Sequence, residues 1–430
     1  IFIPLILLIL LFVSAKSYEI AGILAIEVVL WWFFVEYQLK TRNILFLLIG
    51  FSFFIKFLFI PFLINLEGIE IDSDFRYSNN NLISALLVST FFLGFFFLGQ
   101  IFTSKKKKYY SLEFRLKKKS KTFLIVLVLI GIAISLDLSS ILQQSNNRFE
   151  VTEGMGYLFF FGYSGYFLSA HYTNEFLRNN ISVWNAIVIA LLCGVFFLLR
   201  FHRGGFLYPI IFLILLIVGN RLGIKKTFLM SLVGVPILLE FNIISSAVRT
   251  EYLLGEFRFA NIWSRIMGMH NSFEVPLAFG HVEILAQLFS MGSDSREYLS
   301  TFGSSLFNWV PRKIFPEKSL TTGPILAMRF FPDTKTFDGG YDSSLTTGII
   351  VELFYNFKFF FIIPSFLLGL LYERVNYYIK SYQGHMIQIV FLWLFGFVIF
   401  YDDLGGWINK LFFCWLLAIS INFINKTKIS

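Results

Sequence analysis

The sequence LISALLVSTFFLGFFFLGQIF, residues 82–102, decides the fold class because it carries no charged side chain over the length of a membrane-crossing helix. Comparable apolar runs recur along the whole chain. They predict an all-α, polytopic membrane helical bundle of about a dozen spans. The predicted spans are residues 1–13, 20–35, 44–64, 82–102, 123–141, 155–170, 183–199, 206–219, 227–244, 349–371, 386–400 and 410–424.

Composition excludes an ordinary soluble protein. Hydrophobic residues make up 57% of the 430 residues and charged residues 15%, whereas about a quarter of a typical soluble domain is charged. Cys193 and Cys414 lie inside apolar runs, so neither a disulfide framework nor a cysteine metal cluster is predicted. Residues 1–13 lack the basic flank and cleavage site of a signal peptide. We interpret them as the remainder of a first span, with the native N-terminus missing or processed.

A short basic loop indicates one side of the membrane. Residues 103–122 hold nine lysines and arginines and one glutamate, which is nearly all of the formal charge of +9. Such a loop between two spans is typical of the cytoplasmic side and attracts anionic membrane lipids. Nucleic acid is not a predicted partner, because no aromatic platform or nucleic-acid-binding motif accompanies these cations.

The other loops agree with one orientation. If residues 103–122 are cytoplasmic, the remaining loops on that side are also basic, whereas the opposite set includes the acidic loop 67–74 and the pair Asp402 and Asp403. The predicted topology therefore places both termini in the cytoplasm.

One long segment, residues 246–345, falls on the outer side in this topology. Its stretches 257–266 and 277–289 mix apolar and charged residues at near-helical spacing, which predicts a large, partly helical extracytoplasmic loop. No repeat or flexible linker divides the chain, so residues 1–430 are predicted to form a single integral membrane domain. Acids and bases nearly balance within the loop, and a solvated face is the alternative to a binding site.

Two basic segments hold candidate site residues. WVPRKIFPEK, residues 309–318, places Arg312, Lys313 and Lys318 beside two prolines that restrict the backbone, an arrangement suited to binding phosphate. A structural turn with membrane-surface cations is the alternative. LRFHRGG, residues 199–205, forms a short turn between two predicted spans, where ionisable groups are costly and become functional candidates. Snorkelling of its arginines to lipid headgroups is the alternative there.

GIIVELFYNF, residues 348–357, opens a predicted span and places Glu352, Tyr355 and Asn356 on one helical face. Glu352 is a candidate general base, and neutralisation of an arginine is its alternative role. Glu27 and Lys56 also lie inside predicted spans and are interpreted as a buried pair or as groups near an interface. We expect the residues of turn 199–205, the long loop and Glu352 to converge on one cavity.

Several kinds of chemistry have no motif in the sequence. It contains no P-loop, no glycine-rich dinucleotide motif, no H-E-x-x-H motif and no G-x-S-x-G elbow. We therefore expect no cofactor and a metal-independent reaction.

The chain resembles the Wzy-type O-antigen and oligosaccharide repeat-unit polymerases at three places, which follow one another in the same order. These places are the Arg203-Gly204 turn, the block 310–318, and the stretch 344–369 with its ELFYNF core. Those proteins share the many-span layout and a large extracytoplasmic loop near the C-terminal third. The resemblance covers most of the chain in layout but only short stretches in motif. Family members often carry glycine where this chain has Lys358.

The resemblance implies a GT-C-like membrane glycosyltransferase of the bacterial inner membrane. Its donor and its acceptor are undecaprenyl-pyrophosphate-linked oligosaccharides, which it joins on the outer face into a polysaccharide such as the O-antigen of lipopolysaccharide. A chain-length regulator protein is a further candidate partner. The leaving pyrophosphate needs charge stabilisation, which preorganised cations supply, and the acceptor hydroxyl needs a general base.

The roles that follow are predictions for individual residues. The cations assigned to the donor pyrophosphate are Arg203, Arg312, Lys318 and Arg329. The general-base candidates are Glu352, Glu274, His270 and His281. The remaining predicted substrate-binding residues are Arg200, His202, Arg249, Arg258, Arg265, Lys313 and Tyr355.

Other functions also fit the many-span layout. An O-antigen ligase would use the same donor with a lipid-A-core acceptor. A lipid-linked oligosaccharide flippase or another transporter belongs to a different class, but transporters more often show paired half-repeats and short loops. A non-catalytic scaffold is the third alternative.

Overall fold

The computed structural model describes residues 16–65, 75–103, 116–144, 158–199, 258–272, 280–291, 299–310, 320–332, 347–381, 386–397 and 403–426, with residues 12, 226, 244, 247, 314 and 315. Every regular element within these ranges is a helix, which confirms the all-α class. The predicted spans 1–13, 206–219 and 227–244 lie almost entirely outside the described residues.

Five helical runs of the described chain are long and apolar enough to cross a membrane. Each overlaps a predicted span, and together they support a membrane protein. The runs are α2 (Tyr18–Thr41), Ile44–Ile64, α5 (Asn79–Thr103), Gly348–Lys380 and α19 (Leu404–Lys426).

The run Ile44–Ile64 is not a uniform α-helix. It consists of α3 (Ile44–Phe53), a π-helical turn η1 (Phe54–Phe59) and α4 (Ile60–Ile64). A second π-helical turn, η5 (Trp393–Phe397), follows α18 (Met386–Leu392). Such turns are rare and often occur at functional sites. Lys56 lies within η1, so an ionisable side chain coincides with the irregular turn.

The run Gly348–Lys380 is also interrupted. It divides into α16 (Gly348–Phe357), a 3₁₀ turn η4 (Lys358–Phe361) and α17 (Ile362–Ser381). The predicted span over residues 349–371 lies within this run, which is long and apolar enough to cross a membrane but is not one uniform α-helix. The break lies at Lys358, whose φ of 49° is incompatible with a continuing α-helix. Because 20 residues of α-helix rise about 30 Å, α17 alone has the length of a span.

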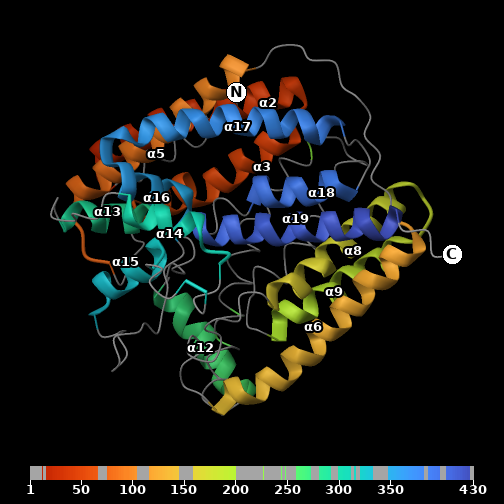
Figure 1. Cartoon of the computed structure of the whole chain (residues 1–430). Helices are drawn as coiled ribbons and strands as arrows, with labels where there is room; N and C mark the ends of the chain where they lie inside the picture. Colours follow the sequence, from red (N-terminus) through yellow and green to blue (C-terminus); the bar gives the residue numbers. More distant parts are fainter. Residues whose placement is uncertain are drawn as a thin grey trace.

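The remaining helices form two further groups (Figure 1). The helices α6 (Lys118–Gln144), α8 (Phe159–Leu177) and α9 (Val183–Leu199) lie together at the lower right. Segment 246–345 contributes α12 (Phe259–Ser272), α13 (His281–Ser290), α14 (Ser300–Leu306) and α15 (Thr322–Phe330), so it is partly helical as predicted. Of these, α13, α14 and α15 gather around α16 at the left, and α12 lies at the bottom.

Two glycines set the packing of α5 against α17, which lie side by side in Figure 1. A Cβ atom on Gly99 would collide with the carbonyl oxygen of Phe366, and one on Gly369 with that of Phe96. Small residues let two helix backbones approach closely, which is how helices associate within lipid. The contact between α5 and α17 therefore depends on both glycines.

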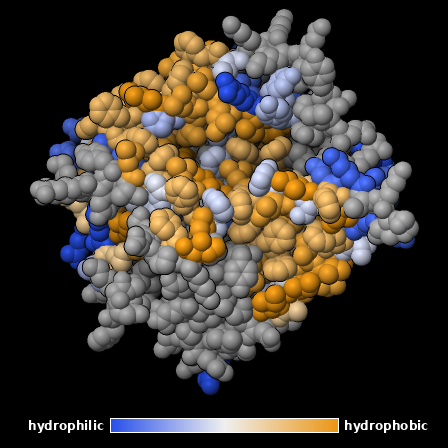
Figure 2. Space-filling view, in the orientation of Figure 1, coloured by the Kyte–Doolittle hydropathy of each residue, from blue (hydrophilic) through white to orange (hydrophobic). Residues whose placement is uncertain are grey.

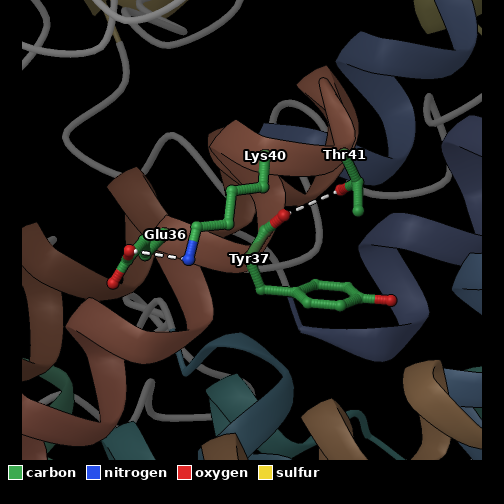
Figure 3. A network of polar contacts seen from close by, with 4 residues as sticks. All are labelled: Glu36, Tyr37, Lys40 and Thr41. Carbon is green, nitrogen blue, oxygen red and sulfur yellow. Dashed lines mark hydrogen bonds and ion pairs between the residues drawn. The ribbon is translucent and has the colours of Figure 1, made fainter.

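The C-terminal end of α2 is stabilised locally (Figure 3). Lys40 forms an ion pair of 2.9 Å with Glu36 one helical turn earlier, and the Thr41 hydroxyl donates to the carbonyl of Tyr37 at 2.9 Å. Arg42 then adopts a left-handed conformation, with φ 52°, which ends the helix. The short turn that follows leads directly into α3.

Apolar side chains cover much of the molecular face in Figure 2, and hydrophilic groups gather toward its edges. Large exposed apolar side chains include Phe33, Phe91, Phe102, Trp184 and Phe359. Soluble monomers rarely expose extended apolar surface. Lipid contact accounts for its presence here.

Candidate functional site

Glu352 lies in a buried polar cluster where three helices meet. Its side chain, on α16, is 0% exposed. Ser305 on α14 donates to Glu352 Oε1 at 2.7 Å, and the backbone amide of Leu404, at the start of α19, donates to Oε2. A carboxyl group buried this deeply requires such donors. Because both donors are neutral, the alternative in which Glu352 neutralises an arginine gains no support from these contacts.

Asn356 extends the cluster one helical turn along α16. Its Oδ1 accepts hydrogen bonds from the Thr301 hydroxyl at 2.7 Å and from the Phe302 amide at 3.1 Å. Its Nδ2 donates to the carbonyl of Glu352 at 2.9 Å. Thr322, the first residue of α15, donates to the Thr301 hydroxyl at 2.9 Å. Side-chain hydrogen bonds thus join α14, α15 and α16.

Asp403 brings a second carboxyl group to the cluster. It caps α19 by accepting the Gly406 amide at 2.6 Å, and it also forms a hydrogen bond with the side chain of Thr321. Burial raises the pKa of Asp403, and these two hydrogen bonds partly oppose that shift. Glu352 and Asp403 are close enough to interact electrostatically. Two carboxyl groups therefore lie at the first turn of α19, whose free amides favour negative charge.

Tyr355, on the same helix, faces cations. Its ring is buried, and Arg329 Cζ on α15 lies 5.8 Å from the ring centroid. Lys358 Nζ lies 5.6 Å from the same centroid and 5.9 Å from that of Phe354. Two predicted site residues, Arg329 and Tyr355, therefore lie together, next to the Glu352 cluster. Lys358 adopts a positive φ, a conformation that glycine takes more readily than a residue with a side chain.

His281 lies at a separate position. Its Nε2 is 3.0 Å from Lys56 Nζ, and both side chains are 1% exposed. The histidine, predicted as a general base of the loop, is thus buried against η1 by α13. On the same helix, Glu283 accepts a hydrogen bond of 3.1 Å from the hydroxyl of Tyr77. Burial and the neighbouring Glu283 carboxylate raise the pKa of Tyr77.

The suggested pairing of Glu27 with Lys56 is wrong. Glu27 accepts a hydrogen bond of 2.7 Å from Ser89, which joins α2 to α5. Lys56 instead contacts His281 across the interface with α13. Both groups are buried polar links between helices, but they belong to different interfaces.

Helix α12 carries three predicted residues at a distance from α16 (Figure 1). Arg258 is exposed immediately before the helix, and Arg265 is half-buried within it. His270 lies in its last turns. Because this helix lies away from α16 in Figure 1, the predicted convergence of Arg258 and Arg265 with Glu352 gains no support from the structure.

More than half of the predicted site residues lie outside the described residues, namely Arg200, His202, Arg203, Arg249, Glu274, Arg312, Lys313 and Lys318. The expected cavity between turn 199–205 and Glu352 is therefore not tested. The other seven predicted site residues lie in the described part of the chain. Glu352, Arg329 and Tyr355 group together, His281 contacts Lys56, and Arg258, Arg265 and His270 belong to α12 or directly precede it.

Six residues of the cluster and its surroundings were not predicted as site residues, namely Thr301, Ser305, Thr321, Thr322, Lys358 and Asp403. Asp403 had a usable signal, because an acid immediately before an apolar run is typical of a helix N-cap. Thr301 and Ser305 had none, since hydroxyl residues in a polar loop are common. Lys358 was noted only as a departure from a family pattern. Its role depends on a backbone conformation that the sequence does not show.

The cluster offers proton-accepting carboxyl groups, hydroxyl donors and neighbouring cations. Within the described ranges, no three His, Cys, Asp or Glu side chains lie together as a metal ion would require. No family model, no curated protein and no solved structure matches this chain. A function must therefore be inferred from these residues and their chemistry.

Proposed function

We propose that the protein is a polysaccharide polymerase of the Wzy type, with about a dozen spans and a GT-C-like fold in the bacterial inner membrane. It joins polyprenyl-pyrophosphate-linked oligosaccharide repeat units on the outer face of that membrane. The proposal rests on the sequence resemblance and on one structural observation. Carboxyl groups and cations gather where helices of segment 246–345 meet α16 and α19.

The location of this cluster supports a reaction on a lipid-linked substrate. Glu352 and Tyr355 belong to a helix that leads directly into the span-length helix α17, whereas Ser305 and Arg329 belong to the long segment. A substrate with a lipid tail and a polar head needs a site that borders both the lipid bilayer and a polar environment. The junction between segment 246–345 and the membrane helices borders both.

The proposed reaction balances without a cofactor. An acceptor hydroxyl oxygen forms a bond to the anomeric carbon of the donor, and the bond from that carbon to the pyrophosphate oxygen breaks. Polyprenyl pyrophosphate leaves with the electron pair, and the hydroxyl proton passes to a general base. In this proposal Glu352 is that base, oriented by Ser305 and the Leu404 amide, and Arg329 stabilises the leaving pyrophosphate. Arg203, Arg312 and Lys318 supply further positive charge.

The experiment that tests the proposal is elongation in vitro. The purified full chain is incubated with one defined polyprenyl-pyrophosphate-linked oligosaccharide, and the products are separated by length. The proposal predicts a ladder of lipid-linked products spaced by one repeat unit, with release of polyprenyl pyrophosphate. Unchanged substrate with properly folded protein would contradict it.

Deletion of the gene separates the rival functions in cells. Loss of a polymerase leaves the lipid-A core capped by single repeat units, whereas loss of a ligase leaves the core uncapped. Loss of a flippase leaves the lipid-linked units on the cytoplasmic face. Arg203→Ala or Arg312→Ala, expressed in the deletion strain at normal protein level, is expected to leave only single repeats. Persistence of long chains would remove these two residues from the proposed mechanism.

A further inference from the structure

The carboxyl groups of Glu352 and Asp403 bind the same helical turn. The Leu404 amide donates to Glu352 Oε2, and the Gly406 amide donates to Asp403 Oδ1 at 2.6 Å. These amides belong to the first and third residues of α19, which lie about 3 Å apart along the helix axis. Two carboxyl groups that bind donors this close must themselves lie close together.

A second element brackets the same two groups. Thr321, directly before α15, forms a side-chain hydrogen bond with Asp403, and the next residue, Thr322, forms one with Glu352. The absence of a side chain at Gly405 allows this approach, because a Cβ atom there would lie 2.8 Å from the Thr321 methyl carbon. Consecutive groups on two elements thus hold the two carboxyl groups side by side.

The donors to both carboxyl groups are neutral. They are one serine hydroxyl, two threonine hydroxyls and two backbone amides. The amides of a helix N-terminus are equivalent to about half a positive charge, so they offset part of one carboxylate and not two. Glu352 and Asp403 also interact electrostatically with each other. Neighbouring carboxyl groups do not both ionise readily, because the first negative charge repels the second.

Other charged or titratable groups lie on the surrounding helices. In the described part of the chain, none of them forms a hydrogen bond with either carboxyl group. On α15, α16, η4, the first two turns of α19, and α13, which packs against α16, these groups are Arg329, Tyr355, Lys358, Lys410, His281 and Glu283. The protonation of Glu352 and Asp403 therefore depends first on the interaction between these two acids.

We propose that Glu352 and Asp403 hold a single proton between them and act as one acid–base pair. In this state one carboxyl group is neutral while the other is ionised. Two interacting carboxyl groups lose their protons in two separate steps that belong to the pair. Between the two steps the pair presents one ionised carboxyl group over a wide range of pH.

The part of this pair in catalysis rests on the proposed function, whereas the shared proton does not. In the proposed reaction the singly ionised pair accepts the proton of the acceptor hydroxyl through Glu352, which leaves both carboxyl groups neutral. One proton then passes to water and restores the singly ionised pair. Asp403 acts through Glu352 in this scheme and is a positioning residue.

Infrared titration of the purified full chain in detergent tests the pair. A protonated carboxyl group has a carbonyl band that an ionised carboxylate lacks, so the spectra follow proton release as pH rises. At neutral pH the unmodified chain is expected to contain one more protonated carboxyl group than the double variant Glu352→Gln, Asp403→Asn. In each single variant the remaining carboxyl group is expected to release its proton at a pH lower by about one unit or more, because the like charge is gone.

Two further variants make the titration specific. Asp403→Ser also keeps a helix cap, so the shift can be measured at Glu352 even if Glu352→Gln does not fold. Glu27→Gln is the matched control, because Glu27 is a buried glutamate that accepts the Ser89 hydroxyl at 2.7 Å at another interface. It is expected to leave proton release from the pair unchanged. Thermal unfolding shows whether each variant is folded.

Two results would overturn the shared proton. One is a difference of none or of two protonated carboxyl groups between the unmodified chain and the double variant at neutral pH. The other is proton release at the same pH in the single variants and in the unmodified chain.

Elongation separates the pair from the proposed function. If the titration shifts as expected but the chain does not elongate glycans, the shared proton stands and the proposed function fails. In an elongating chain, the pH dependence of the rate is expected to show two ionisations, and that of Asp403→Asn only one. Two unchanged ionisations in Asp403→Asn would show that the pair is not the base of the reaction.

Discussion

The hydroxyl of Ser305 donates to Glu352 Oε1 at 2.7 Å, across 47 positions of the sequence. The bond joins α14 of segment 246–345 to α16, and Glu352 is also bound by the first amide of α19. Another serine and glutamate, Ser89 and Glu27, form a bond of the same length between α5 and α2. The described part of the chain therefore contains two buried serine–glutamate pairs, one in the proposed site and one within the helical bundle.

Removal of the Ser305 hydroxyl is expected to destabilise the protein. Ser305→Ala leaves one oxygen of a buried carboxyl group without its donor, which costs about 1–3 kcal/mol. Thermal unfolding of the purified chain in detergent measures the loss. Ser84→Ala is the control, because Ser84 donates only to a carbonyl of its own helix, and its change is expected to stay within about 0.5 kcal/mol. Equal effects of the two substitutions would show that Ser305 does not stabilise this junction.

Lys56 and His281 are expected to act as a coupled pair. Lys56→Met and His281→Phe each leave one buried polar partner at the contact between η1 and α13, so both single variants lose stability. The double variant is expected to lose less than the sum of the two, by about 0.5–3 kcal/mol. Thermal midpoints of the four proteins measure the coupling. Strict additivity would mean that the 3.0 Å contact does not stabilise the docking of α13.

The helical class was predictable because hydrophobic runs of span length leave few alternatives. Residues 82–102 correspond to α5 almost residue for residue. The sequence could not show where irregular turns interrupt such runs. Apolar residues flank both the break at Lys358 and the π-helical turn around Lys56, so composition alone reveals neither interruption.

The candidate site was predictable only in part. Spacing placed Glu352, Tyr355 and Asn356 on one face of a helix, and Arg329 was among the predicted cations. Their partners could not be inferred, because Ser305 and Asp403 come from separate stretches whose approach is set by tertiary structure. His281 was predicted from its chemistry alone. A histidine in a polar loop gives no sign that it will be buried against a membrane helix.

Substitution of glycine by alanine is expected to lower the stability of the protein at Gly99 and to raise it at Gly22. Gly99→Ala places a methyl group against the backbone of α17 and is expected to cost about 1–3 kcal/mol. Nothing lies within 4 Å of a Cβ at Gly22, so Gly22→Ala is expected to stabilise α2 by up to about 1 kcal/mol. Thermal stability and yield after size-exclusion chromatography measure both. A neutral Gly99→Ala would mean that α5 and α17 pack less closely than described.

Asp403 is expected to make the protein less stable as pH rises. Its pKa is raised in the fold, chiefly by burial, from an ordinary value of 3.8. Above that value the folded chain holds a proton that the unfolded chain has lost, so stability falls until the folded pKa is passed. Asp403→Asn keeps a helix cap and removes this titration. The thermal midpoint is therefore expected to fall less steeply with rising pH above 3.8 in the variant. An unchanged slope would contradict this role.

The most direct test of the central claim compares Glu352→Gln with Glu27→Gln in the elongation assay. Both substitutions replace the carboxyl group of a buried glutamate that accepts a serine hydroxyl at 2.7 Å. If Glu352 is the general base, its variant loses elongation by a factor of about 10²–10⁴ at normal protein level, while Glu27→Gln retains it. Full elongation by Glu352→Gln, or an equal loss in both variants, would contradict a catalytic role for the cluster around Glu352.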